Sequence, residues 1–293
     1  MASLASLAGL RRMRQALIGA VLGTTLAAGL LTGCGAATQA GPHPAGSERT
    51  GPAGAGATGP AAAVAVQQEF VSVIQRVLPS VVEIRTNAGL GSGVVLDAAG
   101  DIVTNAHVVT GASRFQVLSD SVAVPGSSAS SPAPMPAVLV GSCPGDDLAV
   151  IRVSADAGLR PATFANSAGV TVGDIVLAIG SPLGLGGSVT EGIVSAIGRS
   201  VAEPASAGTQ AAVLTDTVQT SAAINPGNSG GALVSIDGEV IGIPTLAAVN
   251  RGAGGAAPGI GFAIPASIAV SIGRQLAGTG GANPGTVPSG CQR

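Results

Sequence analysis

Residues 225–231 read Asn-Pro-Gly-Asn-Ser-Gly-Gly, between two short runs of strand-forming residues, Leu214–Gln219 and Ala232–Ile236. Glycines on both sides of Ser229 let the main chain turn its N–H groups toward one point, which side chains would hinder. In a chain with 46 glycines, a glycine-rich hairpin with an incidental serine would read the same way. Taken alone, the segment leaves a nucleophilic serine and a structural turn equally open.

Around this segment, short runs of Val, Ile and Leu alternate with glycine turns, a pattern typical of β-strands. The expected strands form two sets of six: Val81–Arg85, Gly93–Leu96, Ile102–Thr104, Phe115–Leu118, Pro136–Val140 and Leu148–Val153, then Ile175–Ile179, Ser188–Ile197, Leu214–Gln219, Ala232–Ile236, Val240–Ile243 and Gly261–Ile264. No helix-length periodicity separates the sets, which excludes βαβ units. An all-β barrel or sandwich fold is favoured.

Helices are expected at the two ends of this region. Apolar spacing over residues 67–78 predicts a short helix that Pro79 stops. Residues 265–276 predict a C-terminal helix with one apolar face, formed by Ile268, Ala269, Ile272 and Leu276. Segments 119–135 and 247–259 are rich in Ser, Pro, Gly and Ala, which predicts exposed loops. Residues 278–293 are expected to be an irregular tail.

The composition limits what the chain can do. It has 293 residues, enough for a substantial core, but no Lys, Trp or Tyr and only four Phe, so Val, Ile, Leu and Ala must build that core. All 13 basic residues are Arg, and no stretch clusters them with aromatic residues. A nucleic-acid surface is therefore not expected.

The first 34 residues are typical of an export signal. Arg11-Arg12-Met13-Arg14 precedes an apolar run at 16–31, which glycines interrupt and which is short for a membrane span. Leu31-Thr32-Gly33-Cys34 resembles a bacterial lipobox, which implies lipidation of Cys34 and removal of residues 1–33. An ordinary signal peptide or an uncleaved anchor are the alternatives, and the Arg pair leaves Sec and twin-arginine export open.

Residues 34–66 are mostly Gly, Ala, Pro and Thr, which predicts a flexible tether spanning on the order of 30 Å. With the signal removed, 10 Arg remain against 15 acidic residues, a net charge of −5. We expect a protein anchored by lipid to the outer face of the cytoplasmic membrane, in a bacterial cell envelope. His43 lies in the tether and is expected to be solvated.

Three cysteines are present, at 34, 143 and 291. If Cys34 is acylated, Cys143 and Cys291 remain as an even pair in an oxidising compartment. A disulfide between them is one hypothesis, and two unrelated cysteines are the other.

Ser229 needs a base, a carboxylate that orients the base, and donors for an oxyanion. His107 is the only histidine outside the tether, and it follows a predicted strand. A lone histidine is often structural, and it also argues against a multi-histidine metal site. Asp147 begins the buried run 147–151, a position that suits the orienting carboxylate. Asp146 is its rival, and we expect one of the two to be a solvated turn residue.

The order and spacing of His107, Asp147 and Ser229 resemble those of the trypsin-fold proteases, and more closely those of the HtrA (Deg) family of bacterial envelope proteases. The matching stretches run in family order: Gly91–Val95, Thr104–Val109, Asp147–Val150, Val172–Asp174, Ala178–Gly184, Val189–Ser195, Ala223–Leu233, Asp237–Ile243 and Gly261–Pro265. The resemblance implies a chymotrypsin-like fold of two six-stranded Greek-key barrels, at about 79–160 and 161–265, in a protease domain at 67–277.

The same resemblance implies a serine endopeptidase of misfolded or envelope polypeptides, with no cofactor or metal. Gly227, Asn228 and Ser229 would line the oxyanion hole, and the loop near 181–187 would gate it. Ala223, Ile224 and Thr245 are expected at the substrate pocket. No carboxylate lies just before Gly227, so we expect small to medium aliphatic P1 residues.

Several features depart from the family pattern. Only 28 residues follow Pro265, so no PDZ domain is expected. Ser221 stands where the family commonly has Asp, and Pro244 where it usually has a polar residue. A homotrimer built through the segment before the first barrel stays open. So does a catalytically idle or switchable relative that acts as a binding or chaperone module.

Overall fold

The computed structural model of the chain describes residues 60–119, 133–181, 187–203, 212–225, 227–250, 255–278 and 291. The predicted signal peptide, Cys34, His43 and most of the tether lie outside the described residues. So do parts of the predicted loops, at 120–132 and 251–254, and most of the tail.

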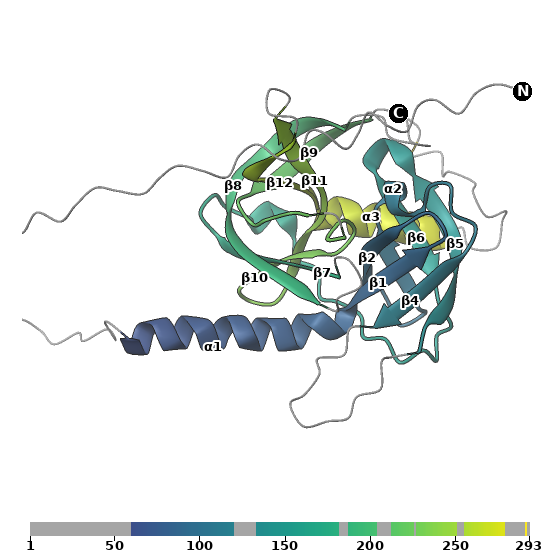
Figure 1. Cartoon of the computed structure of the whole chain (residues 1–293), viewed down its shortest axis with the longest axis horizontal. Helices are drawn as coiled ribbons and strands as arrows, with labels where there is room; N and C mark the ends of the chain where they lie inside the picture. Colours follow the sequence, from purple (N-terminus) through teal and green to yellow (C-terminus); the bar gives the residue numbers. More distant parts are fainter. Residues whose placement is uncertain are drawn as a thin grey trace, which may run out of the picture. The chain divides into compact units, whose positions relative to one another are not determined.

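The first six strands form a closed antiparallel barrel in the order β1-β2-β3-β6-β5-β4 (Figure 1). They are β1 (Val81–Thr86), β2 (Leu90–Val95), β3 (Asp101–Thr104), β4 (Phe115–Ser119), β5 (Met135–Cys143) and β6 (Leu148–Arg152). Ile84, Ile102 and Ile151 fill its interior and are fully buried. Gly93 lets the strands close, since a β-carbon there would lie 2.5 Å from Ile102 Cγ2.

The other six strands close a second barrel in the order β10-β11-β12-β9-β8-β7. They are β7 (Ile175–Gly180), β8 (Ser188–Glu203), β9 (Ala212–Thr220), β10 (Ala232–Ser235), β11 (Val240–Asn250) and β12 (Gly255–Pro265). Val176, Ala178 and Leu233 are among its buried core residues. All twelve predicted strands are therefore present, six in each barrel.

Helix α3 (Ala266–Gly278) packs against both barrels (Figure 1). Its buried residues Ala269, Ile272 and Leu276 belong to the predicted apolar face, whereas Ile268 is only half-buried. Leu276 lies over Gly141 of β5, and Arg152 of β6 donates to the Ala277 oxygen over 3.3 Å. The last turn of α3 thus packs on the first barrel.

Helix α1 (Pro60–Val77) begins seven residues before the predicted start, so residues 60–66 are helical rather than part of a tether. Proline suits the first turn of a helix, and the following run is rich in alanine, the residue with the highest helix propensity. Short 3₁₀ turns lie at Leu78–Ser80, Pro144–Asp146 and Ser167–Gly169. No helix among the described residues is long and apolar enough to cross a membrane.

The prediction of an exposed loop at 247–259 was largely wrong. Strands β11 and β12 pair as far as Val249 opposite Ala256 and Asn250 opposite Gly255, which leaves only 251–254 between them. Main-chain pairing has here overridden the weak strand propensity of Gly and Ala. Strand β8 likewise runs to Glu203, beyond the predicted end at Ile197.

Candidate active site

Asp147 lies in the turn that leads into β6. It follows the 3₁₀ turn Pro144–Asp146, and its N–H donates to the Pro144 oxygen over 3.2 Å. Its main chain is left-handed, with φ 50° and ψ 42°, a conformation that Asp tolerates better than most residues. The side chain is nearly fully buried. The turn therefore projects a carboxylate inward at the start of the strand, as predicted from the sequence.

The Asp147 carboxylate is held by donors from both barrels. The His107 Nδ1 atom lies 2.9 Å from Oδ2 and 3.1 Å from Oδ1, and the His107 N–H donates to Oδ1 over 3.0 Å. From β11, the Thr245 hydroxyl donates to Oδ2 over 2.5 Å. An imidazole that gives its Nδ1 hydrogen to a carboxylate carries its lone pair on Nε2, so it can act there as a base.

His107 sits on a one-turn helix, α2 (Ala106–Val109), that follows strand β3. The side chain of Asn105, just before this helix, donates to the Asp147 main-chain oxygen over 2.9 Å. Asn105 is fully buried. The histidine and the aspartate are thus tied together at both main chain and side chain, which restrains the imidazole in one orientation.

Ser229 lies in the turn before β10. The Ser92 N–H of β2 donates to the Ser229 oxygen over 2.9 Å, so the first barrel holds the main chain of this residue. The Ser229 hydroxyl donates to the Thr245 oxygen over 3.2 Å. Thr245 therefore contacts Asp147 with its side chain and Ser229 with its main chain, and it joins the three predicted catalytic residues in one set of contacts.

The segment around Ser229 has the main-chain conformation that its glycines allow. Gly227 has φ 104° and Gly230 φ 82°, values that side-chain-bearing residues rarely adopt. Pro226 lies outside the described residues. The Asn228 N–H donates to the Asn225 oxygen over 3.0 Å. That N–H is therefore engaged in the turn. The lining of an oxyanion hole by Gly227, Asn228 and Ser229 stays a prediction.

The predicted pocket residues lie in different environments. Ala223 is exposed, and its oxygen accepts a hydrogen bond from Thr190 over 2.9 Å. Ile224 is 7% exposed and packs in the core of the second barrel. Thr245 is nearly buried with its hydroxyl on Asp147. The assignment of these three residues to a substrate pocket stays a prediction. The contact of the Thr245 hydroxyl with Asp147 was not predicted, because nothing in the local sequence shows which neighbour that hydroxyl meets.

Asp146 is not the solvated turn residue that we expected. It is buried, and its Oδ2 accepts a hydrogen bond from the Cys143 thiol over 3.2 Å. Cys143 and Cys291 are both buried free thiols here, with Cys143 Sγ 3.8 Å from the Cys291 oxygen. Burial, followed by hydrogen bonds to Cys291 and Asp146, raises the pKa of the Cys143 thiol far above its ordinary value. Their pairing as a disulfide stays a prediction.

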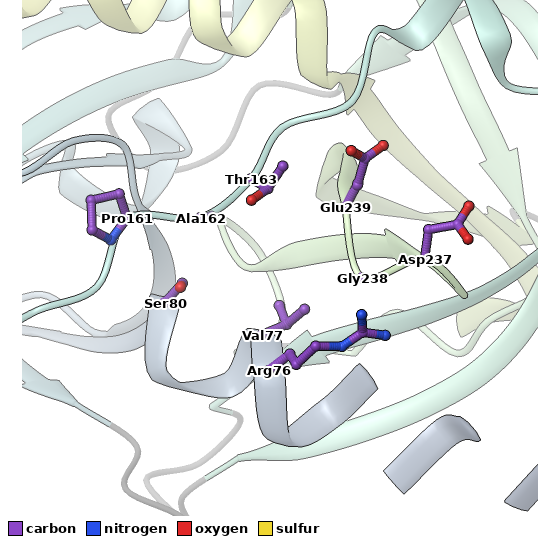
Figure 2. A pocket seen from close by; sticks show the side chains of 9 residues that line it. All are labelled: Arg76, Val77, Ser80, Pro161, Ala162, Thr163, Asp237, Gly238 and Glu239. Atoms are coloured by element: carbon purple, nitrogen blue, oxygen red, sulfur yellow. The ribbon is translucent and has the colours of Figure 1, made fainter. Parts of the chain in front are cut away.

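A surface pocket lies between the end of α1, the segment that links the barrels, and the turn between β10 and β11 (Figure 2). Its lining residues are Arg76, Val77, Ser80, Pro161, Ala162, Thr163, Asp237, Gly238 and Glu239. The described residues contain no cluster of His, Cys, Asp and Glu that suits a metal ion.

Comparison with known proteins places these residues in a known domain. Residues 91–243 match the model of the trypsin-like peptidase domain. Over 72% of its length the chain is 43% identical to the serine protease PepD of Mycobacterium tuberculosis, of which it covers 47%. A solved structure of the HtrA-type protease AlgW with a tripeptide is 38% identical, with a TM-score of 0.59 over 71% of this chain and 63% of that one. The chain belongs to the HtrA family of trypsin-like serine proteases.

This result confirms the predicted HtrA family and the predicted trypsin-like double-barrel fold. The periplasmic serine endoprotease DegP of Escherichia coli K12 is 42% identical over 64% of this chain, which covers 35% of that protein. A serine endoprotease structure from Yersinia pestis is 36% identical, with a TM-score of 0.56 over 71% of this chain and 66% of that one. The chain spans less than half the length of PepD and DegP.

Proposed function

We propose that this HtrA-family chain is a serine endopeptidase that cleaves polypeptides through an acyl-enzyme. One observation carries the proposal: a buried carboxylate, Asp147, holds Nδ1 of His107, and Thr245 joins that carboxylate to Ser229. A structural β-domain has no need of a buried carboxylate that binds an imidazole and is joined through Thr245 to a serine in a glycine turn.

In the proposed reaction, Nε2 of His107 takes the Ser229 hydroxyl proton as the oxygen attacks the scissile carbonyl carbon. The carbonyl oxygen becomes an oxyanion, for which the N–H groups of Gly227 and Ser229 are the proposed donors. The imidazolium then protonates the leaving amine as the C–N bond breaks, which leaves an ester on Ser229. Water, deprotonated by His107, hydrolyses the ester and returns the serine. Asp147 stays ionised and stabilises the imidazolium throughout.

A fluorophosphonate tests the proposal, because it labels a serine only when that serine is activated. We expect labelling of the purified protein and none of Ser229→Ala. Peptide-library cleavage by a soluble form that begins after Cys34 should likewise depend on Ser229. Identical product profiles from the soluble form and from the same form with Ser229→Ala would overturn the proposal. A Ser229→Ala protein that still binds unfolded chains, beside a wild type that takes no label, would favour the binding or chaperone module.

We also propose that the substrate pocket accepts small to medium aliphatic P1 residues. The residues just before the oxyanion segment, Ala222, Ala223 and Ile224, carry no charge that would receive an Arg or Lys side chain. The peptide library should show cleavage after Val or Ala. Efficient cleavage after Arg, with none after Val or Ala, would contradict this preference.

Finally, we propose that lipid on Cys34 anchors the protein to the outer face of the cytoplasmic membrane. Support comes from the lipobox-like Leu31-Thr32-Gly33-Cys34 and from relatives that are described as periplasmic. Labelled palmitate should enter the wild type, and Cys34→Ala should move the protein from the membrane to the soluble fraction. A Cys34→Ala protein that remains fully membrane-bound would contradict anchoring through this residue.

A further inference from the structure

Ser92 belongs to the first barrel, yet most of its hydrogen bonds go to the second. It lies on β2 and is fully buried. Its N–H donates to the Ser229 oxygen over 2.9 Å, and its hydroxyl donates to the Gly227 oxygen over 2.6 Å. The same hydroxyl accepts the Ser181 N–H over 2.8 Å. One residue thus contacts the main chain on both sides of Asn228.

The Gly227–Asn228 peptide group is held at both of its polar atoms. Its oxygen accepts from the Ser92 hydroxyl, and its N–H donates to the Asn225 oxygen over 3.0 Å. Gly227 has φ 104° and, as a glycine, has more alternative conformations than any other residue. Since its own N–H is one of the two proposed oxyanion donors, a contact that fixes its carbonyl also restricts where that N–H can point.

The Ser92 hydroxyl is itself fixed in direction. A hydroxyl has one hydrogen to donate, and the Ser181 N–H occupies one of its acceptor positions, so the hydrogen is directed at the Gly227 oxygen. Ser181 is held in turn, because its hydroxyl donates to the buried Glu83 of β1 over 2.9 Å. The Ser92 oxygen accepts from the Thr104 hydroxyl over 2.6 Å. Every polar group of Ser92 is therefore engaged.

We propose that Ser92 is a positioning residue for the oxyanion hole: its hydroxyl holds the Gly227–Asn228 peptide group so that the Gly227 N–H faces the developing oxyanion. The proposal rests on the proposed endopeptidase function. Ser92 touches no reacting atom, so its hydroxyl acts through the Gly227 main chain. Loss of its hydroxyl weakens binding of the tetrahedral transition state more than binding of the uncleaved substrate.

Ser92→Ala in the full-length protein tests this role. Loss of one oxyanion donor lowers kcat by about 100- to 1000-fold. Because Ser92 only positions such a donor, we expect kcat to fall by about 10- to 100-fold, with KM changed by less than about threefold. Affinity for a peptide boronic acid, which forms a tetrahedral adduct on the serine, should fall in parallel with kcat. Affinity for a cleaved product peptide should not change.

Ser80→Ala is the matched control, because Ser80 is also a buried serine near the first barrel but lines the pocket in Figure 2. It should leave kcat and boronic acid affinity unchanged. If Ser92→Ala fails to fold, as thermal melting would show, Ser92→Cys serves instead. That variant keeps a weaker donor of similar shape. Its kcat and boronic acid affinity should fall by less than in Ser92→Ala, again with KM and product affinity unchanged.

The proposal is overturned if a folded Ser92 variant keeps kcat and boronic acid affinity within about threefold of wild type. It is also overturned if KM rises and product affinity falls as much as boronic acid affinity falls. The substitution would then have weakened binding of the substrate and of the transition state equally. Failure of the proposed function looks different, since the wild type itself would then show no Ser229-dependent cleavage.

Discussion

The hydroxyl of Ser229 donates to the main-chain oxygen of Thr245 over 3.2 Å, while the hydroxyl of Thr245 donates to Asp147 over 2.5 Å. A serine hydroxyl has one hydrogen, so it must rotate away from Thr245 before His107 can take it. In the proposed mechanism, Thr245 therefore acts on both ends of the triad: its main chain holds the nucleophile at rest, and its side chain stabilises the orienting carboxylate.

Thr245→Val removes the hydroxyl with little change in shape and leaves the main-chain oxygen in place. A hydrogen bond to a charged group contributes about 1.5–3 kcal/mol. Loss of about 1.4 kcal/mol of transition-state stabilisation lowers the rate about tenfold. We expect kcat/KM for a peptide substrate to fall about tenfold. Thr245→Ser keeps the hydroxyl and should stay near wild type. Equal rates for Val and Ser variants would show that the contact with Asp147 is unimportant.

Gly230 directly follows Ser229 and lies where the two barrels meet. Its φ is 82°, and a β-carbon there would lie 2.2 Å from the Ser92 oxygen and 2.4 Å from Thr104 Oγ1. Gly230→Ala therefore combines a strained main chain with overpacking against backbone, and we expect about 3 kcal/mol of destabilisation. Activity should fall more than about 100-fold, because Ser92 and Ser229 are displaced together.

Gly111→Ala is the control for that variant. Gly111 also has a positive φ, 73°, but a β-carbon there would have no neighbour within 4 Å. It should cost only about 1 kcal/mol in urea unfolding and leave activity intact. If Gly230→Ala and Gly111→Ala lose the same free energy of unfolding, crowding at Gly230 is not the cause of the destabilisation.

Arg152 and Asp101 form a two-pronged ion pair between β6 and β3, with N–O distances of 2.6 and 2.8 Å. The hydrogen bonds to Asp101 raise the pKa of Arg152. Asp101 is 1% exposed, so Arg152→Ala leaves a buried charge without a partner and should destabilise the fold by about 3 kcal/mol. The double variant Asp101→Ala/Arg152→Ala should be more stable than Arg152→Ala in urea unfolding. A double variant less stable than the single one would contradict this account.

The sequence was sufficient to predict the twelve strands, because strand periodicity is a local signal. It also singled out His107, Asp147 and Ser229, which contacts through Thr245 connect in the structure. It did not distinguish the roles of Asp146 and Thr245. Asp146 is buried, and its carboxylate accepts a hydrogen bond from the thiol of Cys143, three residues earlier. Thr245 meets Asp147 across the two barrels, 98 residues apart. Such contacts depend on how closed barrels dock, which local propensity does not encode.

The raised pKa of the Cys143 thiol predicts a loss of stability in alkali. The ordinary thiol pKa is 9.0, and burial raises that of the folded state far above it. Above pH 9 the unfolded chain therefore loses a proton that the folded chain keeps, so unfolding becomes easier as pH rises. The free energy of unfolding should fall by about 1.4 kcal/mol per pH unit.

The chain suits this measurement because it contains no Lys or Tyr, the residues that usually titrate in the same range. Urea unfolding of the reduced protein between pH 9 and about 11 should show the slope, and Cys143→Ala should reduce it. Oxidation that joins Cys143 to Cys291 would also abolish it, since a disulfide has no proton to lose. Thiol counting in denaturant separates the two states: free thiols at 143 and 291 accompany the slope, and their disappearance without reductant would establish the disulfide.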